Sequence, residues 1–287
     1  MKKIDPFAPM KRIISFGDSF TLGLGTDRIV EDQLFQSAKN RQEGKDKQRK
    51  FEINNSFTKF FADKFKVPFI NTATPGCGNK DILDEMMRWD MNKGFEKDDF
   101  VLVGFTSSYR DKLPFFPDEY NNNVRSGFQW SMKELSRLSN ANDIFFWKDG
   151  NNKWTNLPDD FKNNLNNFMK NYLKFYMVEV FDDSYWQMYS SNIIVYIQKY
   201  LEFKKINYIM IDAFEPMLNK IPKFINRKCY WKCAKENIWS YLKTFNDKDL
   251  FEIKGHWNIN ETVSKHPSRK GHKLFAEELY RFYNEVY

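Results

Sequence analysis

The sequence of 287 residues is poor in cysteine and histidine, with three of each. An odd and sparse set of cysteines argues against a disulfide framework and favours a reducing compartment, so we expect a cytoplasmic protein. Cys229 and Cys233 have no second cysteine pair beside them, and His256 alone does not complete a zinc site. We therefore expect neither a bound metal nor any other cofactor.

Long apolar runs are also missing. No stretch approaches the roughly 20 apolar residues of a membrane-spanning helix, and residues 1–6 lack the apolar run of a secretory signal. The formal charge is +7, and much of the excess of lysine and arginine lies in residues 39–50, where we expect a solvated, mobile loop. This balance is weak support for nucleic-acid binding, so we expect neither nucleic acid nor a membrane as a partner.

The chain does contain apolar residues for a sizeable core, since 41% of it is hydrophobic. Continuous apolar runs, typical of parallel strands covered on both faces, lie at residues 11–16, 67–73, 98–105 and 206–213. Apolar residues at spacings of three and four predict helices at residues 57–65, 82–89 and 275–282. The alternation predicts an α/β fold with an open parallel sheet and helices on both faces, whose ligands bind beyond the carboxyl ends of the strands.

One domain, residues 1–287, accounts for this length. Residues 107–205 separate the third and fourth predicted strands by far more than one crossover helix requires. They are rich in asparagine and aromatic residues. We therefore expect a mostly helical insertion or lid there.

Polar and small residues follow each of the first three predicted strands. Ser19 stands where the first strand turns into a helix, so its hydroxyl can be exposed above the sheet and its N–H can face an oxyanion. An ordinary helix cap by Asp18 or Ser19 fits equally well. After the second strand, Gly76 permits close approach of a backbone N–H, and Asn79 either donates from its side chain or caps the next helix.

The last informative segment is a His-Pro loop before the C-terminal helix. A serine nucleophile needs a base within hydrogen-bonding reach, and His266 on this loop fits that task. His272 lies inside the start of the helix, so we expect it to pack or to cap.

Taken together, these blocks resemble the SGNH, or GDSL-type, hydrolase superfamily, in a divergent branch common among phage-encoded members. The resemblance implies a flavodoxin-like three-layer α/β/α fold and esterase, lipase or carbohydrate deacetylase activity. It implies Ser19 as nucleophile and His266 as general base, with the N–H groups of Ser19 and Gly76 in the oxyanion hole. Further candidates around this site are Asp18, Asn79, Thr106, Ser108 and Arg110.

Two positions depart from the family pattern. The third block usually carries an asparagine that donates to the oxyanion, but the aligned stretch reads Thr106-Ser107-Ser108-Tyr109, so Ser108 or Asn79 would replace it. The family's aspartate three residues before the histidine is Val263 here, and Glu261 is the nearest acid upstream. Either Glu261 orients His266 or a Ser–His dyad works with a backbone carbonyl.

We expect a serine hydrolase, an esterase or O-deacetylase, acting on a small ester or an acetylated glycan in the host cytoplasm or a virion. The absent acid and asparagine favour one alternative, a catalytically weak or inactive module of the same fold that binds a glycan or a protein. Acyl transfer by the same serine is another. A distance between Ser19 and His266 above about 4 Å would favour binding over catalysis.

Overall fold

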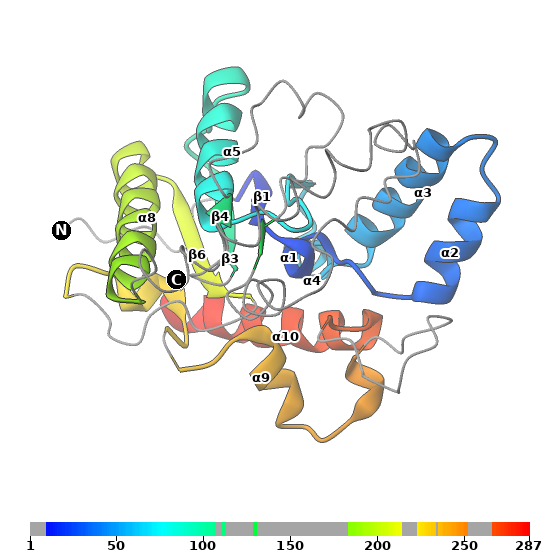
Figure 1. The fold of residues 1–287 in the computed structure, drawn as a ribbon. Helices are drawn as coiled ribbons and strands as arrows, with labels where there is room; N and C mark the ends of the chain where they lie inside the picture. Colours follow the sequence, from blue (N-terminus) through cyan, green and yellow to red (C-terminus); the bar gives the residue numbers. More distant parts are fainter. Residues whose placement is uncertain are drawn as a thin grey trace, which may run out of the picture.

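The computed structural model describes residues 10–106, 111–112, 129–130, 183–213, 223–233, 235–251 and 266–287. In these residues the centre of the fold is a five-stranded sheet in the order β2-β1-β3-β6-β7, in which all neighbouring strands are parallel (Figure 1). The strands are β1 (Arg12–Gly17), β2 (Phe69–Asn71), β3 (Asp99–Phe105), β6 (Asn207–Asp212) and β7 (Tyr230–Trp231). This order is flavodoxin-like, and it reverses direction between β1 and β3. The four predicted strands are confirmed.

Alternate residues of the central strands supply two separate cores, because successive side chains in a strand point to opposite faces. Ile14 and Val101 pack under α5 (Asn79–Asn92) and α8 (Asp183–Lys204) on one face. Ile13 and Leu102 pack on the other face, under α4 (Phe57–Phe65), α9 (Ile238–Lys243) and α10 (Arg269–Val286). Helices therefore cover both faces of the sheet, which confirms the three-layer α/β/α prediction (Figure 1).

The segment between β1 and α4 is helical rather than extended. It forms α1 (Ser19–Leu22), α2 (Arg28–Gln36) and α3 (Arg41–Asn54). The mobile loop predicted for residues 39–50 is therefore wrong. Asn40 caps α3 by accepting a hydrogen bond from Glu43 N (2.9 Å), and Gly44 lets the helix approach the ring of Phe35. Its charged side chains are still mostly exposed, as expected.

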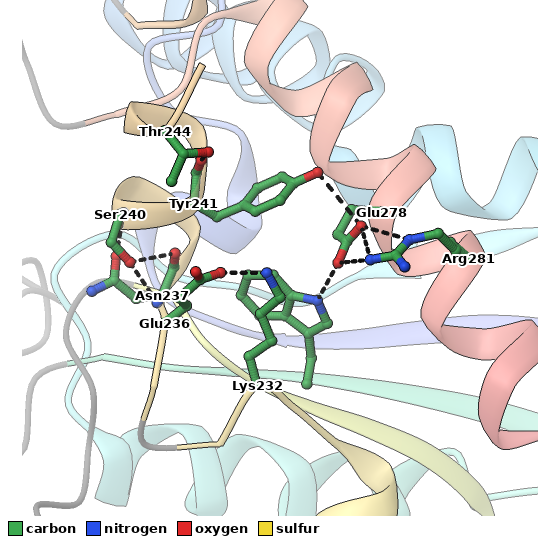
Figure 2. A network of polar contacts seen from close by, with 9 residues as sticks. Lys232, Glu236, Asn237, Ser240, Tyr241, Thr244, Glu278 and Arg281 are labelled. Carbon is green, nitrogen blue, oxygen red and sulfur yellow. Dashed lines mark hydrogen bonds and ion pairs between the residues drawn. The ribbon is translucent and has the colours of Figure 1, made fainter. Parts of the chain in front are cut away.

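The C-terminal helix α10 is attached to the rest of the fold by buried polar contacts. His272 is fully buried, and its Nδ1 accepts a hydrogen bond from Phe57 N at the start of α4 (3.2 Å). Of the two expected roles, packing or capping, the structure shows packing; the N-caps are Ser268 for α10 and Ser56 for α4. On the side of β7 and α9, the buried Glu278 carboxylate accepts from Trp231 Nε1 (3.1 Å) and from the Arg281 guanidinium (2.8 Å), as Figure 2 shows.

Part of the predicted insertion at residues 107–205 can be compared with the structure. Its last part forms α8, which covers the sheet as a crossover helix between β3 and β6. Two short strands, β4 (Asp111–Lys112) and β5 (Gln129–Trp130), pair antiparallel. The other residues of the insertion lie outside the described ranges, so its helical character and the single-domain organisation over 1–287 stay predictions. Among the described helices, none has the length and apolar character to cross a membrane.

Two short 3-10 helices complete the described elements. η3 (Arg227–Cys229) leads directly into β7, the strand that the sequence did not predict. η4 (Lys248–Leu250) precedes Phe251, which forms an isolated bridge with Pro267. This bridge brings the segment after α9 to the start of α10, beside the predicted catalytic histidine.

Candidate active site

The nucleophile predicted from the sequence begins a single helical turn at the carboxyl end of β1. Asp18 is the N-cap of α1, and its Oδ1 accepts from Phe20 N (3.0 Å). The capping role that the sequence left open therefore belongs to Asp18. Ser19 is the first residue of α1, where helix N–H groups and the positive end of the helix favour a developing anion. The turn ends at Gly23, whose φ of +95° is a conformation that favours glycine.

The predicted base lies beside this serine. His266 Nε2 and Ser19 Oγ are 2.9 Å apart, although the two residues are separated by 247 positions in the sequence. The distance is within hydrogen-bonding range and well under 4 Å. Ser19 is 7% exposed and His266 is partly exposed. The pair can therefore exchange a proton while it is largely shielded from bulk water.

Three backbone contacts hold the loop that carries His266. Pro267 bridges to Phe251, Ser268 N donates to Leu250 O (2.9 Å), and Arg269 N donates to Thr26 O (2.8 Å). Thr26 belongs to the loop that follows α1, so the segment with the nucleophile and the segment with the base are bonded directly. This contact fixes the backbone of the base relative to that of the nucleophile.

Helix α1 approaches the sheet so closely that the two residues beneath it have to be glycines. Gly17 and Gly104 face each other in the register of β1 and β3, and Thr21 of α1 lies over both. A Cβ at either glycine would lie within 2.2 Å of Thr21 Oγ1. The glycine before Asp18 therefore matters because it lets α1 sit directly on the sheet, in addition to any turn it permits.

The glycine block after β2 forms a tight turn on the same strand end. Cys77 N donates to Thr74 O (3.3 Å), with Pro75 and Gly76 between them and a φ of +75° at Gly76. Proline followed by a glycine at positive φ is the pattern of a type II turn. Thr74 N (2.9 Å) and Cys77 Sγ (3.2 Å) both donate to Gly17 O, which attaches the turn to the residue before Asp18.

Cys77 is therefore explained by packing and hydrogen bonding. Gly76 itself is exposed, and a Cβ there would meet nothing within 4 Å. The backbone of the turn is thus open to solvent at Gly76.

Asn79 connects the glycine-containing turn after β2 with the segment that follows β3. It is the first residue of α5, and the N-cap is Gly78, so Asn79 is not the cap. Its Oδ1 accepts from Thr106 N (2.9 Å) and its Nδ2 donates to Thr106 O (3.3 Å). Both residues are buried. The amide thereby holds the backbone that follows β3 against the start of α5, and this pairing was not anticipated from the sequence.

The remaining predicted site residues, Glu261, Ser108 and Arg110, lie outside the described ranges. In the described part of the chain, no cluster of three or more potential metal ligands is present. Asp212, at the end of β6, accepts from the buried Tyr230 hydroxyl (2.5 Å). Burial and the charge of Asp212 raise the pKa of Cys233 to about 12, so this thiol stays protonated near neutral pH.

Two further residues next to the site have no motif in the sequence. Phe20 packs its ring against His266, with centroids 4.8 Å apart. Arg49 of α3 donates from Nη2 to Ala73 O (3.0 Å), just before the turn that contains Gly76. Arg49 falls in the basic run, where only the charges could be read. A motif-based reading therefore had no signal for either contact.

The second histidine near the site has a different electrostatic character. Burial, and to a smaller extent the charge of His266, lower the pKa of His272 to about 3. His272 therefore stays neutral under ordinary conditions and accepts the α4 amide through Nδ1. Of the two, only His266 is placed to exchange a proton with Ser19.

Comparisons with known proteins add little to this geometry. No protein-family model matches the chain, and no curated protein matches it. Similar solved structures include esterase EstA from Pseudoalteromonas sp., with 12% identity, a TM-score of 0.40 and coverage of 96% of this chain and 97% of that one. Scores this low do not assign a function.

Two further solved structures come from the G-D-S-L family. The protein from Desulfitobacterium hafniense DCB-2 has 13% identity and a TM-score of 0.35, over 95% of this chain and 99% of that one. The lipolytic protein from Veillonella parvula DSM 2008 has 9% identity and a TM-score of 0.34, over 94% and 97%. Neither of these two similarities assigns a function, because both scores are low.

Proposed function

We propose that this chain is a serine hydrolase of the SGNH type, an esterase or O-deacetylase acting on a small ester or an acetylated glycan. The observation that carries the proposal is the 2.9 Å separation of Ser19 Oγ and His266 Nε2 at the switch point of a flavodoxin-like sheet. The separation supports catalysis over a binding module, for which no such pairing is needed. The divergent phage-type branch, and a place in the host cytoplasm or virion, belong to the same proposal.

In the proposed reaction, Ser19 Oγ attacks the carbonyl carbon of the ester while His266 Nε2 takes the hydroxyl proton. This requires the tautomer of His266 that carries its proton on Nδ1. The tetrahedral oxyanion is held by the N–H groups of Ser19 and Gly76. His266 then gives its proton to the departing alcohol, which leaves an acyl group on Ser19.

Water completes the cycle by the same steps. His266 takes a proton from water, hydroxide adds to the acyl carbon, and the collapse of the second intermediate returns a proton to Ser19 and releases the carboxylic acid. Glu261 or a backbone carbonyl orients Nδ1 of His266. Asp18 supports the helix turn. Asn79 and Thr106 form the third wall of the site, and Ser108 and Arg110 are proposed to contribute to substrate binding.

A fluorophosphonate probe tests the nucleophile, because it labels only an activated serine. We expect labelling of the wild type and none of Ser19→Ala. Ser15→Ala is the matched control, since Ser15 is a buried serine on β1, the strand that leads to Ser19, with a long hydrogen bond from its hydroxyl (3.5 Å). Equal labelling of Ser19→Ala and wild type would show that the proposed nucleophile is wrong.

A turnover assay separates hydrolysis from acyl transfer. Release of p-nitrophenol from p-nitrophenyl acetate is measured with and without an added sugar acceptor. We expect a rate independent of the acceptor and lost in Ser19→Ala and His266→Gln. A rate that depends on the acceptor would contradict hydrolysis and identify a transferase.

A further inference from the structure

The aromatic ring beside the proposed base belongs to the same helical turn as the proposed nucleophile. The ring centroids of Phe20 and His266 are 4.8 Å apart and the ring planes are inclined by 32°. This is close to an offset stack, with one face of the imidazole covered by the phenyl ring. One helical turn, α1, therefore contacts the base in two ways, through Ser19 Oγ and through the Phe20 ring.

Phe20 is itself held firmly. It is 2% exposed and belongs to the core between the sheet and the layer of α4, α9 and α10. Asp18 accepts from its backbone N–H. A side chain fixed on several sides loses little further freedom when it contacts the imidazole, so it can act as a rigid support.

Two kinds of contact act on His266. The bridge at Pro267 and the bonds of Ser268 N and Arg269 N fix the backbone after His266 and act on its ring only indirectly. The hydrogen bond to Ser19 orients the ring only while Ser19 Oγ has its proton to share. Once Ser19 carries an acyl group, that bond is lost, and the stack with Phe20 is a contact that persists through the second half of the reaction.

We propose that Phe20 is a positioning residue that holds the plane of the His266 imidazole and stabilises its protonated form through the face of the phenyl ring. The inference depends on the proposed hydrolase function. A cation over an aromatic face is favourable, and the effect grows when water is excluded. The ring thereby supports the imidazolium that forms each time His266 takes a proton, and it keeps the ring aligned for water after acylation.

The test compares substitutions that separate bulk from aromatic character. Phe20→Leu keeps an apolar side chain over the imidazole but removes the aromatic face. Pentafluorophenylalanine at position 20 keeps the shape and reverses the sign of charge on the ring face. Phe61→Leu is the matched control, because Phe61 is a fully buried core phenylalanine of α4 that contacts other rings and not His266.

Histidine NMR gives a readout that does not depend on turnover. The chain has three histidines, and burial keeps the pKa of His272 near 3, so above about pH 4.5 the His272 signal does not move with pH and is set apart. His266→Gln assigns the His266 signal. We expect the pKa of His266 to fall by about half a unit or more, a threefold change or larger, in Phe20→Leu and in the pentafluoro variant. Phe61→Leu should leave it unchanged.

The comparison is controlled because no charged group changes. The titratable groups on the elements bonded to the His266 loop stay the same in every variant. Among the described residues they include Asp18 before α1, Glu31 beside Thr26, Asp247, Lys248 and Asp249 at η4, and Arg269, Lys270 and His272 at the start of α10. A lowered pKa extends the active form of the base to lower pH, so the acidic limb of the pH–rate profile should move down by the same amount.

Kinetics supply the second readout. We expect kcat of Phe20→Leu to fall about tenfold with little change in KM, and release of the acyl group to slow more than its formation. The inference is overturned if Phe20→Leu and Phe61→Leu share the same His266 pKa and the same kcat. Failure of the wild type to react with the fluorophosphonate would instead contradict the proposed function, and the NMR titration then still decides whether the ring stabilises the imidazolium.

Discussion

Replacing Gly76 with alanine tests the proposed oxyanion donor with a change of one methyl group. The turn Thr74–Cys77 has its i+2 residue at a φ of +75°. Alanine avoids this conformation, and the turn can relieve the strain by changing from type II to type I. That change rotates the peptide between Pro75 and Gly76 by roughly 150–170°. The rotated peptide carries the N–H of residue 76, so the donor would point away from the oxyanion.

The magnitude follows from the empty space around Gly76. A Cβ there meets nothing within 4 Å, so the cost is conformational strain alone, about 1–2 kcal/mol. The lower entropy of alanine in the unfolded chain offsets part of this, which leaves about 1 kcal/mol and a fall in Tm of about 2 °C. Loss of one oxyanion donor lowers kcat by about 10²-fold or more. We therefore expect a variant that is nearly as stable as wild type and about 10²-fold slower.

Gly94→Ala is the matched control. Gly94 has a φ of +76° and, like Gly76, open space where its Cβ would lie. It follows α5, where its carbonyl accepts from Arg12 at the start of β1, the end of the strand opposite the site. The strain and the loss of stability should match those of Gly76→Ala, while kcat should match wild type.

The assay measures p-nitrophenyl acetate hydrolysis and the thermal midpoint of both variants. Equal kcat values for Gly76→Ala and Gly94→Ala would refute the reasoning, because the donor would then have no part in the rate. A much larger fall in Tm for Gly76→Ala than for Gly94→Ala would refute the assumption that strain alone is involved.

Three further outcomes concern stability and the support of the site. Glu278→Ala removes the acceptor of a buried indole N–H and should cost about 2–3 kcal/mol in urea unfolding, whereas Arg281→Ala, at the exposed end of the same ion pair, should cost less. The pKa of His272 is about 3 in the folded protein and 6.5 in the free side chain. The free energy of unfolding should therefore be highest above pH 6.5 and fall by up to about 1.4 kcal/mol per pH unit toward pH 3. If His272→Gln shows the same dependence of unfolding free energy on pH, this prediction is wrong. Arg49→Met removes the hydrogen bond to Ala73 O and should lower kcat about fivefold with KM unchanged; an unaltered kcat would show that α3 does not support the turn.

The parts of the fold that could be predicted are those that depend on the pattern of neighbouring residues in the sequence. β1, β3 and β6 are continuous apolar runs with short polar boundaries, so their places followed from periodicity. β7 is only Tyr230–Trp231, and two residues form no pattern. It pairs with β6 because its two aromatic side chains fill both cores, one on each face of the sheet, which is a tertiary effect.

The helix α3 was missed although its start was readable. High charge at residues 39–50 indicated solvation, and solvation was taken to mean a loop. Lysine, arginine and glutamine are good helix formers, and Asn40 followed three residues later by Glu43 is a helix-start signal. Asn40 Oδ1 does accept from Glu43 N, and Glu43 Oε2 accepts a hydrogen bond from the Lys39 N–H.

At the proposed site, the Ser19–His266 pair could be located from the sequence more readily than the residues that contact it. Ser19 and His266 carry motifs because few other residues can perform their chemistry. Asn79 was read as a donor or a cap, yet its amide holds the Thr106 backbone, and no local pattern encodes a partner 27 residues away. Phe20 likewise has no signature among 29 phenylalanines, since stacking is set by where the chain folds.

The bond from the Phe57 N–H to His272 also has a consequence for how the protein is made. It joins residues 215 positions apart, so the first turn of α4 lacks this acceptor until α10 has been synthesised. The start of α10 follows directly on His266. At about 5–20 residues per second, the ribosome delivers both histidines roughly 10–40 s after Phe57. We therefore expect the N-terminal helices to reach their final positions in the same late step that brings Ser19 and His266 together. A nascent chain should then lack the proposed hydrolytic activity until α10 has packed against the core.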